Sequence, residues 1–155
     1  MWLAGAACAV LPDLDVLAFR FGIPYEHVLG HRGITHSAAF SAAFAALLVV
    51  LAFRGGVSGL GAGRLWLYLA LATLSHAALD AMTDGGLGVA LLAPFENGRY
   101  FLPFRPIEVS PIGVRRFFTE RGVAVLASEL IWVGLPSLVF AAVMWMTRRR
   151  SIGRA

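Results

Sequence analysis

The sequence contains no lysine and a single cysteine, and only 14% of its 155 residues are charged. An average soluble domain has about 25% charged residues, so this composition argues against a soluble domain and predicts a membrane protein. The lone cysteine, Cys8, excludes a disulfide framework within the chain and a thiolate cluster for a metal ion. We expect Cys8 to be a small buried side chain.

The absence of lysine leaves all thirteen basic charges on arginine, with a formal net charge of +4. In a soluble protein this balance would suggest a nucleic-acid partner. Here the arginines flank apolar runs, and no arginine run is interleaved with aromatic residues in the pattern of a nucleic-acid-binding surface. Arginines in such places set membrane topology and contact anionic headgroups. The predicted partner is therefore a lipid bilayer, and not nucleic acid.

Long apolar runs make up most of the chain, in which 59% of the residues are hydrophobic. A helix needs about 20 apolar residues to cross a hydrocarbon core of about 30 Å. Candidate helices lie at residues 2–11, 34–53, 65–82 and 123–146, of which the first is only half a span. We predict an all-α polytopic helical bundle of about four membrane spans, forming one domain over residues 1–155. The proline-rich and aromatic loop 85–122 is predicted to be an ordered surface lid.

A group of acidic and histidine side chains falls where these runs end or begin. If the spans alternate in direction, the end of the first, the start of the second and the end of the third share one face of the membrane. That face carries Asp13, Asp15, His31, His36, His76, Asp80 and Asp84. The opposite face carries the arginine-rich segment 148–154, and positive charge beside a span favours the cytoplasm. We therefore predict that the polar face lies outside the cytoplasm.

Two pairs in this group have the spacing of a shared ligand site. His76 and Asp80 are four residues apart, which places both side chains on one face of a helix, one turn apart. Asp13 and Asp15 alternate along the chain, and an extended stretch there would aim both carboxylates into one pocket. A lone histidine at a membrane edge is more often interfacial or hydrogen-bonded than a ligand. The convergence of several such groups favours a bound cation.

Mixed imidazole and carboxylate ligands suit Zn²⁺, Mn²⁺ or Fe²⁺. An aspartate near the bilayer centre costs about 2.5–3.5 kcal/mol, so such groups need a partner or a function. We predict a divalent metal cofactor of one or two ions, with zinc or manganese favoured. The predicted ligands are Asp13, Asp15, His31, His36, His76 and Asp80. Two ions about 3.5–4 Å apart would activate water and stabilise charge on a phosphoryl group.

A metal site at a membrane surface predicts a hydrolase that acts on a phosphoester, with a lipid or another amphiphilic molecule as its substrate. A guanidinium binds phosphate in a bidentate manner, so arginines near the site are the candidates for holding the substrate. These are Arg32, Arg99 and Arg105; for Arg32 the alternative role is headgroup anchoring. The residues predicted to carry the reaction are Asp15, His36, Asp80 and Arg32.

Three segments of the sequence carry a resemblance to a known family: LPDLD at 11–15, HRGITHS at 31–37 and SHAALDAMTDGG at 75–86. In this order they resemble motifs of the YdjM family, and the stretch 94–113 is similar to that family's loop between its later spans. The resemblance covers roughly residues 9–113. It implies a small multi-pass inner-membrane protein with a bound divalent metal and hydrolase activity. The motif positions are Asp13, Asp15, His31, Arg32, His36, His76 and Asp80. Members of the family usually carry a Thr-His pair ahead of the first motif, which residues 1–10 lack.

Other functions are compatible with some of the same residues. The cluster would also suit metal transport or sensing, although transport sites tend to lie near the bilayer midplane on broken helices. The segment HAALD at 76–80 matches the His-x-x-x-Asp end of the membrane phosphatidic acid phosphatase signature, in which the histidine is the nucleophile. That signature also requires a lysine-bearing motif, which this sequence lacks.

Overall fold

The fold is that of a computed structural model, which describes residues 1–57, 59–112 and 114–152. The chain divides into two compact units, Met1–Arg105 and Pro106–Ala155. Both are mostly helical, as predicted, whereas the single-domain organisation stays a prediction. All residues of the candidate site belong to the first unit.

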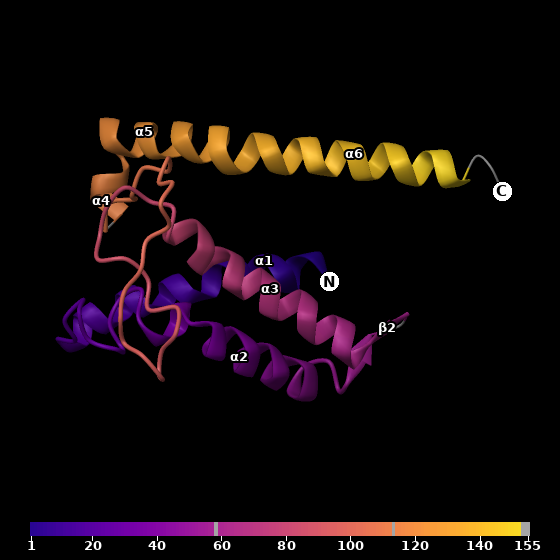
Figure 1. Cartoon of the computed structure of the whole chain (residues 1–155), viewed down its shortest axis with the longest axis horizontal. Coiled ribbons are helices and arrows are strands. Elements are labelled where there is room, and N and C mark those ends of the chain that lie inside the picture. The colour runs from indigo at the N-terminus through magenta and orange to yellow at the C-terminus, as the bar shows by residue number, and fades with distance from the viewer. Residues whose placement is uncertain (58, 113, 153–155) are drawn as a thin grey trace. The chain divides into compact units, whose positions relative to one another are not determined.

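Three α-helices frame the first unit (Figure 1): α1 (Trp2–Val10), α2 (Ala38–Leu51) and α3 (Ala62–Asp80). α3 packs against both of the others. Cys8 of α1, Ala45 of α2 and Leu69 of α3 lie in their common core, which confirms that Cys8 is a small buried side chain. The close approach of α1 to α3 depends on Gly5, because a Cβ atom there would lie 2.0 Å from the Tyr68 hydroxyl oxygen.

The second helix begins later than predicted because the backbone breaks at Ser37. This residue has an extended backbone, and its hydroxyl accepts a hydrogen bond from the Phe40 N–H group at 3.0 Å, which makes it the N-cap of α2. Before it, Ile34–His36 form a separate 3-10 turn, η2. The 14 residues of α2 extend about 21 Å, less than a hydrocarbon core of about 30 Å. One continuous helix over 34–53 is therefore wrong, whereas the crossing of a membrane by this segment stays a prediction.

A short β-hairpin joins α2 to α3. Strand β1 (Gly56–Val57) pairs with β2 (Leu60–Gly61) in antiparallel register, with Gly56 opposite Gly61. Glycines are poor helix formers and supply the left-handed backbone that tight turns need, as at Gly55 with φ +89°. The prediction of a purely α-helical chain is corrected by this small sheet.

The polar break after α1 is helical. Residues Leu11–Phe21 form a 3-10 helix, η1, which ends at Gly22 with a left-handed φ of 74°. Pro12 is tolerated because its missing N–H falls at the first turn. The extended backbone predicted for Asp13 and Asp15 is therefore wrong, although both carboxylates still reach the candidate site.

The loop that follows α3 is fixed to the rest of the first unit by backbone hydrogen bonds. The Ala38 N–H group donates to the Leu91 carbonyl at 3.0 Å, and the Ala90 N–H group donates to the Arg32 carbonyl at the same distance. Val89, which comes just before Ala90 in the sequence of this loop, is fully buried. The order predicted for this loop is confirmed up to the end of the first unit, and its action as a lid stays a prediction.

The second unit contains a long helical rod (Figure 1). Its described elements are α4 (Val114–Phe117), α5 (Glu120–Glu129), the π-helical turn η3 (Leu130–Gly134) and α6 (Leu135–Ile152). The π turn comes just before Pro136, which has no N–H group to continue the regular hydrogen-bond ladder. α4 and the start of α5 lie inside the predicted loop 85–122, so the last part of that prediction is corrected.

Within the described residues, two helical stretches are long and apolar enough to cross a membrane. They are Trp2–Phe21 and Glu120–Arg149, whereas α2 is apolar but shorter. The number of membrane spans, about four, stays a prediction.

Candidate metal centre

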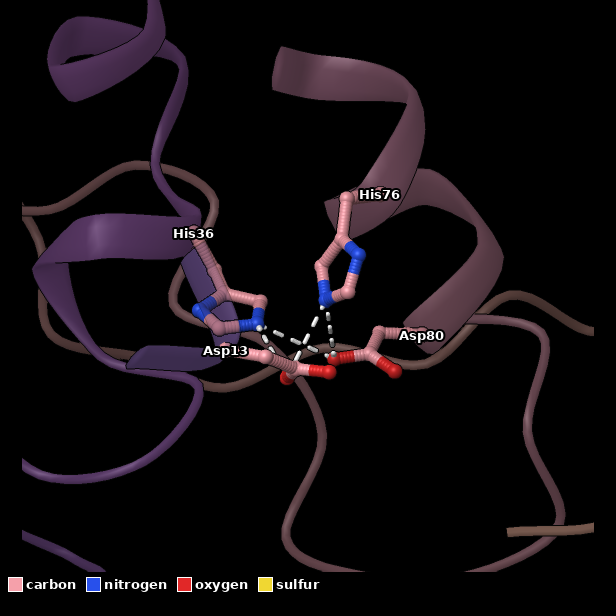
Figure 2. Close-up of side chains that lie close together, drawn as sticks. All are labelled: Asp13, His36, His76 and Asp80. Carbon is pink, nitrogen blue, oxygen red and sulfur yellow. Dashed lines mark ion pairs between the residues drawn. The ribbon is translucent and has the colours of Figure 1, made fainter. Parts of the chain in front are cut away.

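Three segments far apart in the sequence bring four predicted ligands together. η1 supplies Asp13, η2 supplies His36, and the last turns of α3 supply His76 and Asp80. Figure 2 shows the two imidazole rings and the two carboxylates pointing toward one another. We call these four residues the quartet. The His76 Nε2 and Asp80 Oδ2 atoms are 3.8 Å apart, which confirms the pairing predicted from their i, i+4 spacing.

The ligand atoms of the quartet lie within 4.8 Å of one another. His36 Nε2 is 3.1 Å from Asp80 Oδ2, and His76 Nε2 is 3.2 Å from Asp13 Oδ1. His36 Nε2 is 3.8 Å from the same Asp13 oxygen. Two nitrogen and two oxygen atoms therefore surround one small volume, and each aspartate approaches both histidines.

Several atoms of the quartet are buried without a hydrogen bond. His36 Nε2, His76 Nε2 and Asp80 Oδ2 have no hydrogen-bond partner within the part of the chain that the structure describes. The His36 side chain has 0% exposure, and its Nε2 atom points into the quartet. Buried polar atoms are normally hydrogen-bonded, so three that face one another at ion-pair distances without a hydrogen bond are compatible with a cation site.

Asp15 and His31 form a second group on the other side of His36. Asp15 Oδ1 lies 2.6 Å from His31 Nδ1, and Asp15 Oδ2 lies 3.1 Å from His36 Nδ1. The Thr35 hydroxyl donates to Asp15 Oδ2 at 2.6 Å and lies 3.1 Å from His36 Nδ1. Because His36 Nδ1 faces two oxygen atoms, it carries the ring proton in the neutral form, and the Nε2 lone pair faces the quartet.

The charge state of His36 follows from these neighbours. Burial disfavours the imidazolium form, but the adjoining aspartates, first Asp13 and then Asp15, outweigh burial and raise the pKa of His36 to about 10. The protonated ring carries a proton on Nε2 that faces the carboxylate oxygens of Asp13 and Asp80, and a cation in this place would displace that proton.

Arg32, which was predicted to bind substrate and take part in the reaction, is buried, and both of its terminal nitrogens donate hydrogen bonds, whereas its Nε has no partner among the described residues. Its Nη2 donates to Asp80 Oδ1 at 3.0 Å, and its Nη1 donates to Thr83 Oγ1 at 3.0 Å and to the Gly85 carbonyl at 3.1 Å. Its own N–H group donates to Asp15 Oδ2 at 3.0 Å from a left-handed backbone with φ 60°. The arginine thus joins the quartet to the Asp15 group.

The other two predicted substrate arginines lie elsewhere. Arg99 donates to backbone carbonyls, among them those of His31 at 3.0 Å and Tyr25 at 2.8 Å. The Arg105 guanidinium lies over the Phe101 ring, 4.8 Å from its centroid. Neither guanidinium forms a hydrogen bond or ion pair with the quartet among the contacts of the described residues, and their role toward substrate stays a prediction.

No role was predicted for Tyr25, and the contact of Thr83 with Arg32 was not predicted either. The Tyr25 ring stacks on the His31 ring with centroids 5.3 Å apart. Thr83 stands at the end of α3, where its hydroxyl also donates to the Asp80 carbonyl at 2.8 Å. The Thr-Asp-Gly sequence after a helix was the available signal for such a cap.

Together these features define a class of protein: a helical, apolar chain with a candidate histidine and aspartate metal centre formed by η1, η2 and the end of α3. The family described as YdjM inner membrane protein matches residues 1–151, and the chain belongs to that family. It is 43% identical over 146 residues to the Inner membrane protein YbcI of Escherichia coli (strain K12), an alignment that covers 94% of this chain and 83% of that relative. No solved structure matches the chain. The family and the relative support the predicted inner-membrane location, whereas the orientation stays a prediction.

Proposed function

We propose that this chain is a membrane-bound metal-dependent hydrolase that cleaves phosphoesters of amphiphilic, lipid-like molecules. One observation carries the metal-dependent part. Three buried ligand atoms of the quartet face one another without hydrogen-bond partners among the described residues. The hydrolytic part and the substrate class rest on the donor set, the open side of the site and its apolar surroundings.

The spacing of the quartet supports a single small divalent cation. Ligands about 2.0–2.2 Å from a tetrahedral ion are separated from one another by about 3.3–3.6 Å. The four nitrogen-to-oxygen separations in the quartet, 3.1, 3.2, 3.8 and 3.8 Å, lie close to that range. Two imidazole nitrogens with two carboxylate oxygens suit Zn²⁺ or Mn²⁺.

Local charge also supports a divalent cation. The carboxylates of Asp13, Asp15 and Asp80 lie around His36. In the described contacts of this cluster, the Arg32 guanidinium is the positive group that pairs with them. With neutral histidines, two negative charges are left in a largely buried site, and one divalent ion compensates both.

One side of the quartet is open. The Asp13 side chain is 49% exposed, whereas those of Asp80 and His36 are 15% and 0% exposed. Asp13 is therefore the most open ligand for an approaching substrate, while the remaining ligands are more enclosed by the protein. A bound divalent cation supplies a Lewis acid and activates water at neutral pH, which is the chemistry that phosphoester hydrolysis needs.

The residues around the cation have distinct tasks in this proposal. Arg32 holds Asp80 through Oδ1 and leaves Oδ2 for the cation. Asp80 and His76 bind from one helix, so their separation is fixed by the helix. These contacts place the ligands before a cation arrives, which lowers the entropic cost of binding.

The surroundings of Asp13 support an amphiphilic substrate. Leu14 and Leu17, on the same short helix as Asp13, are 61% and 46% exposed. The chain belongs to an inner membrane protein family, so acyl chains are available at such a surface. A lipid phosphoester would place its polar group at the quartet and its chains against these leucines.

The test combines metal analysis with an activity assay on the protein purified in detergent. Wild type, His76→Ala, Asp80→Asn and Glu26→Gln are dialysed against Zn²⁺ or Mn²⁺, and bound metal is measured by mass spectrometry. Glu26 is an exposed carboxylate outside the quartet and serves as the matched control. The same samples are assayed with bis-p-nitrophenyl phosphate and with phosphatidic acid in mixed micelles.

We expect about one ion per chain and hydrolysis of at least one phosphoester in wild type and in Glu26→Gln. Metal content and hydrolysis should both fall to background in the two quartet variants. Stoichiometric metal without hydrolysis would overturn the hydrolase assignment and favour transport or sensing. Absence of bound metal from wild type would overturn the proposal as a whole.

A further inference from the structure

We propose that Asp15 is a positioning residue that orients His36 toward a single ion, and that the Asp15, His31 and His36 group does not hold a second ion. This inference rests on the metal site of the proposed function. It concerns the six predicted ligands, which the structure divides between two groups that share His36. The two groups differ in whether their ligand atoms already have hydrogen-bond partners within the protein.

The Asp15 carboxylate is surrounded by four groups that can donate a hydrogen bond. Its Oδ1 atom faces His31 Nδ1, and its Oδ2 atom accepts from the Arg32 N–H group and the Thr35 hydroxyl and also faces His36 Nδ1. Each carboxylate oxygen has about two lone-pair positions, so Oδ2 is fully occupied, whereas Oδ1 is paired with His31 alone among these four groups. A cation at Asp15 would have to displace them in a place where the carboxylate is only 3% exposed.

The quartet has the opposite character. His36 Nε2, His76 Nε2 and Asp80 Oδ2 are buried and have no hydrogen-bond partner among the described residues. The ligand atoms that need a cation therefore all lie on the Nε2 side of the His36 ring. The Nδ1 side already has its partners.

The shared histidine also argues against two ions. A neutral imidazole has one lone-pair nitrogen, and its other nitrogen carries a proton. Ions in both groups would have to bind both nitrogens of His36 after that proton is lost. His36 Nδ1 instead faces Asp15 Oδ2 and the Thr35 hydroxyl, each at 3.1 Å, which is the usual arrangement of a carboxylate behind a metal-binding histidine.

His31 supports Asp15 rather than the ion in this arrangement. Its ring lies between aromatic neighbours, stacked on Tyr25 and edge-on to Phe19 with centroids 6.3 Å apart. The His31 Nδ1 atom is 2.6 Å from Asp15 Oδ1. The fixed ring thus holds one carboxylate oxygen while the other contacts His36.

The test is a Co²⁺ titration of the detergent-purified protein, followed by the visible absorption of the bound ion. The variants are Asp15→Asn, Thr35→Val and the ligand variant Asp80→Asn, with Glu26→Gln as the control. Thr35→Val removes one neighbour of Asp15 and of His36 Nδ1 and leaves the Asp15 charge in place. It is therefore a second readout that does not depend on the folding of Asp15→Asn.

We expect wild type to bind one Co²⁺ per chain. Asp15→Asn should still bind one ion, about 10–100-fold more weakly, with shifted absorption bands because His36 is no longer held in one orientation. Thr35→Val should show a smaller change of the same kind. Asp80→Asn should lose binding, and Glu26→Gln should match wild type.

Three results would overturn the inference. The first is two ions per chain in wild type with one in Asp15→Asn, which would make Asp15 a ligand of a second ion. The second is an affinity and a spectrum in both Asp15→Asn and Thr35→Val that match wild type. The third is complete loss of the ion from Thr35→Val. Failure of wild type to bind any Co²⁺, Zn²⁺ or Mn²⁺ would instead refute the metal site itself.

Discussion

At the residue scale, the buried Arg32 guanidinium fixes the position of the Asp80 carboxylate. The Arg32 side chain is 4% exposed, and the 3.0 Å contact between its Nη2 and Asp80 Oδ1 is an ion pair largely removed from water. Its other terminal nitrogen binds Thr83 and the Gly85 carbonyl. Removing one partner of a buried ion pair leaves the other charge without compensation.

We expect Arg32→Gln to reduce the free energy of unfolding by about 3–5 kcal/mol, because Asp80 would remain charged and largely buried without its partner. Thermal unfolding in detergent without added metal measures the change. The control is Arg105→Gln, where an exposed guanidinium over Phe101 is lost and the expected cost is about 0.5–1 kcal/mol. Equal effects of the two substitutions would contradict the role assigned to Arg32.

The candidate residues could be predicted from the sequence. Their division into the quartet and the Asp15 group could not. The i, i+4 spacing of His76 and Asp80 was sufficient because helix geometry fixes that pair locally. Which aspartate faces the cation depends on tertiary hydrogen bonds: Asp15 is occupied by donors from the segment after Gly30, whereas Asp13 is half-exposed. No local pattern encodes such contacts.

Arg99 illustrates a second limit at this scale. It was predicted to bind substrate because it lies in a loop near the motifs, but its guanidinium donates to backbone carbonyls of the segment that contains Tyr25 and His31. Any arginine can bind a carbonyl group, so sequence carries no signal for this role.

At the element scale, the segment between η1 and η2 determines where His31, Arg32 and His36 lie. It turns so tightly that a Cβ atom on Gly33 would lie 2.2 Å from the Val28 carbonyl oxygen. The obstacle is backbone, which cannot rotate away as a side chain tip can. The turn therefore requires glycine at this position.

We expect Gly33→Ala to destabilise the first unit by about 1–3 kcal/mol through overpacking, and to weaken Co²⁺ binding because the turn carries His36. Gly63→Ala is the matched control, since its Cβ meets no atom within 4 Å and alanine favours the helix by about 1 kcal/mol. Unfolding temperature and Co²⁺ affinity are measured on both. Unchanged affinity in Gly33→Ala would show that this turn does not position the ligand.

Helix boundaries were predicted less well than helix existence. The apolar run after His36 correctly indicated a helix, but the run alone does not show that Ser37 caps it and separates η2 from α2. The expected extended stretch at Asp13 is a 3-10 helix, because Pro12 fits a first helical turn and Gly22 ends it. Capping contacts decide such boundaries, and hydrophobicity does not.

At the scale of the whole molecule, the apolar surface agrees with the family assignment. Trp2 and Leu3 of α1 are 88% and 87% exposed, and Leu51 of α2 is 68% exposed. A soluble protein rarely exposes so many large apolar side chains to water. In a member of an inner membrane protein family, lipid would cover this surface. Composition predicted this property without any knowledge of the fold.

The central claim is that residues from η1, η2 and α3 bind one divalent cation. The most direct measurement is zinc-edge X-ray absorption of the protein loaded with one equivalent of Zn²⁺. We predict nitrogen and oxygen ligands only, with outer-shell scattering from two imidazole rings, and no specifically bound zinc in His76→Ala. Sulfur scattering, which would require Cys8 or a methionine, or the absence of imidazole scattering in wild type would contradict the claim.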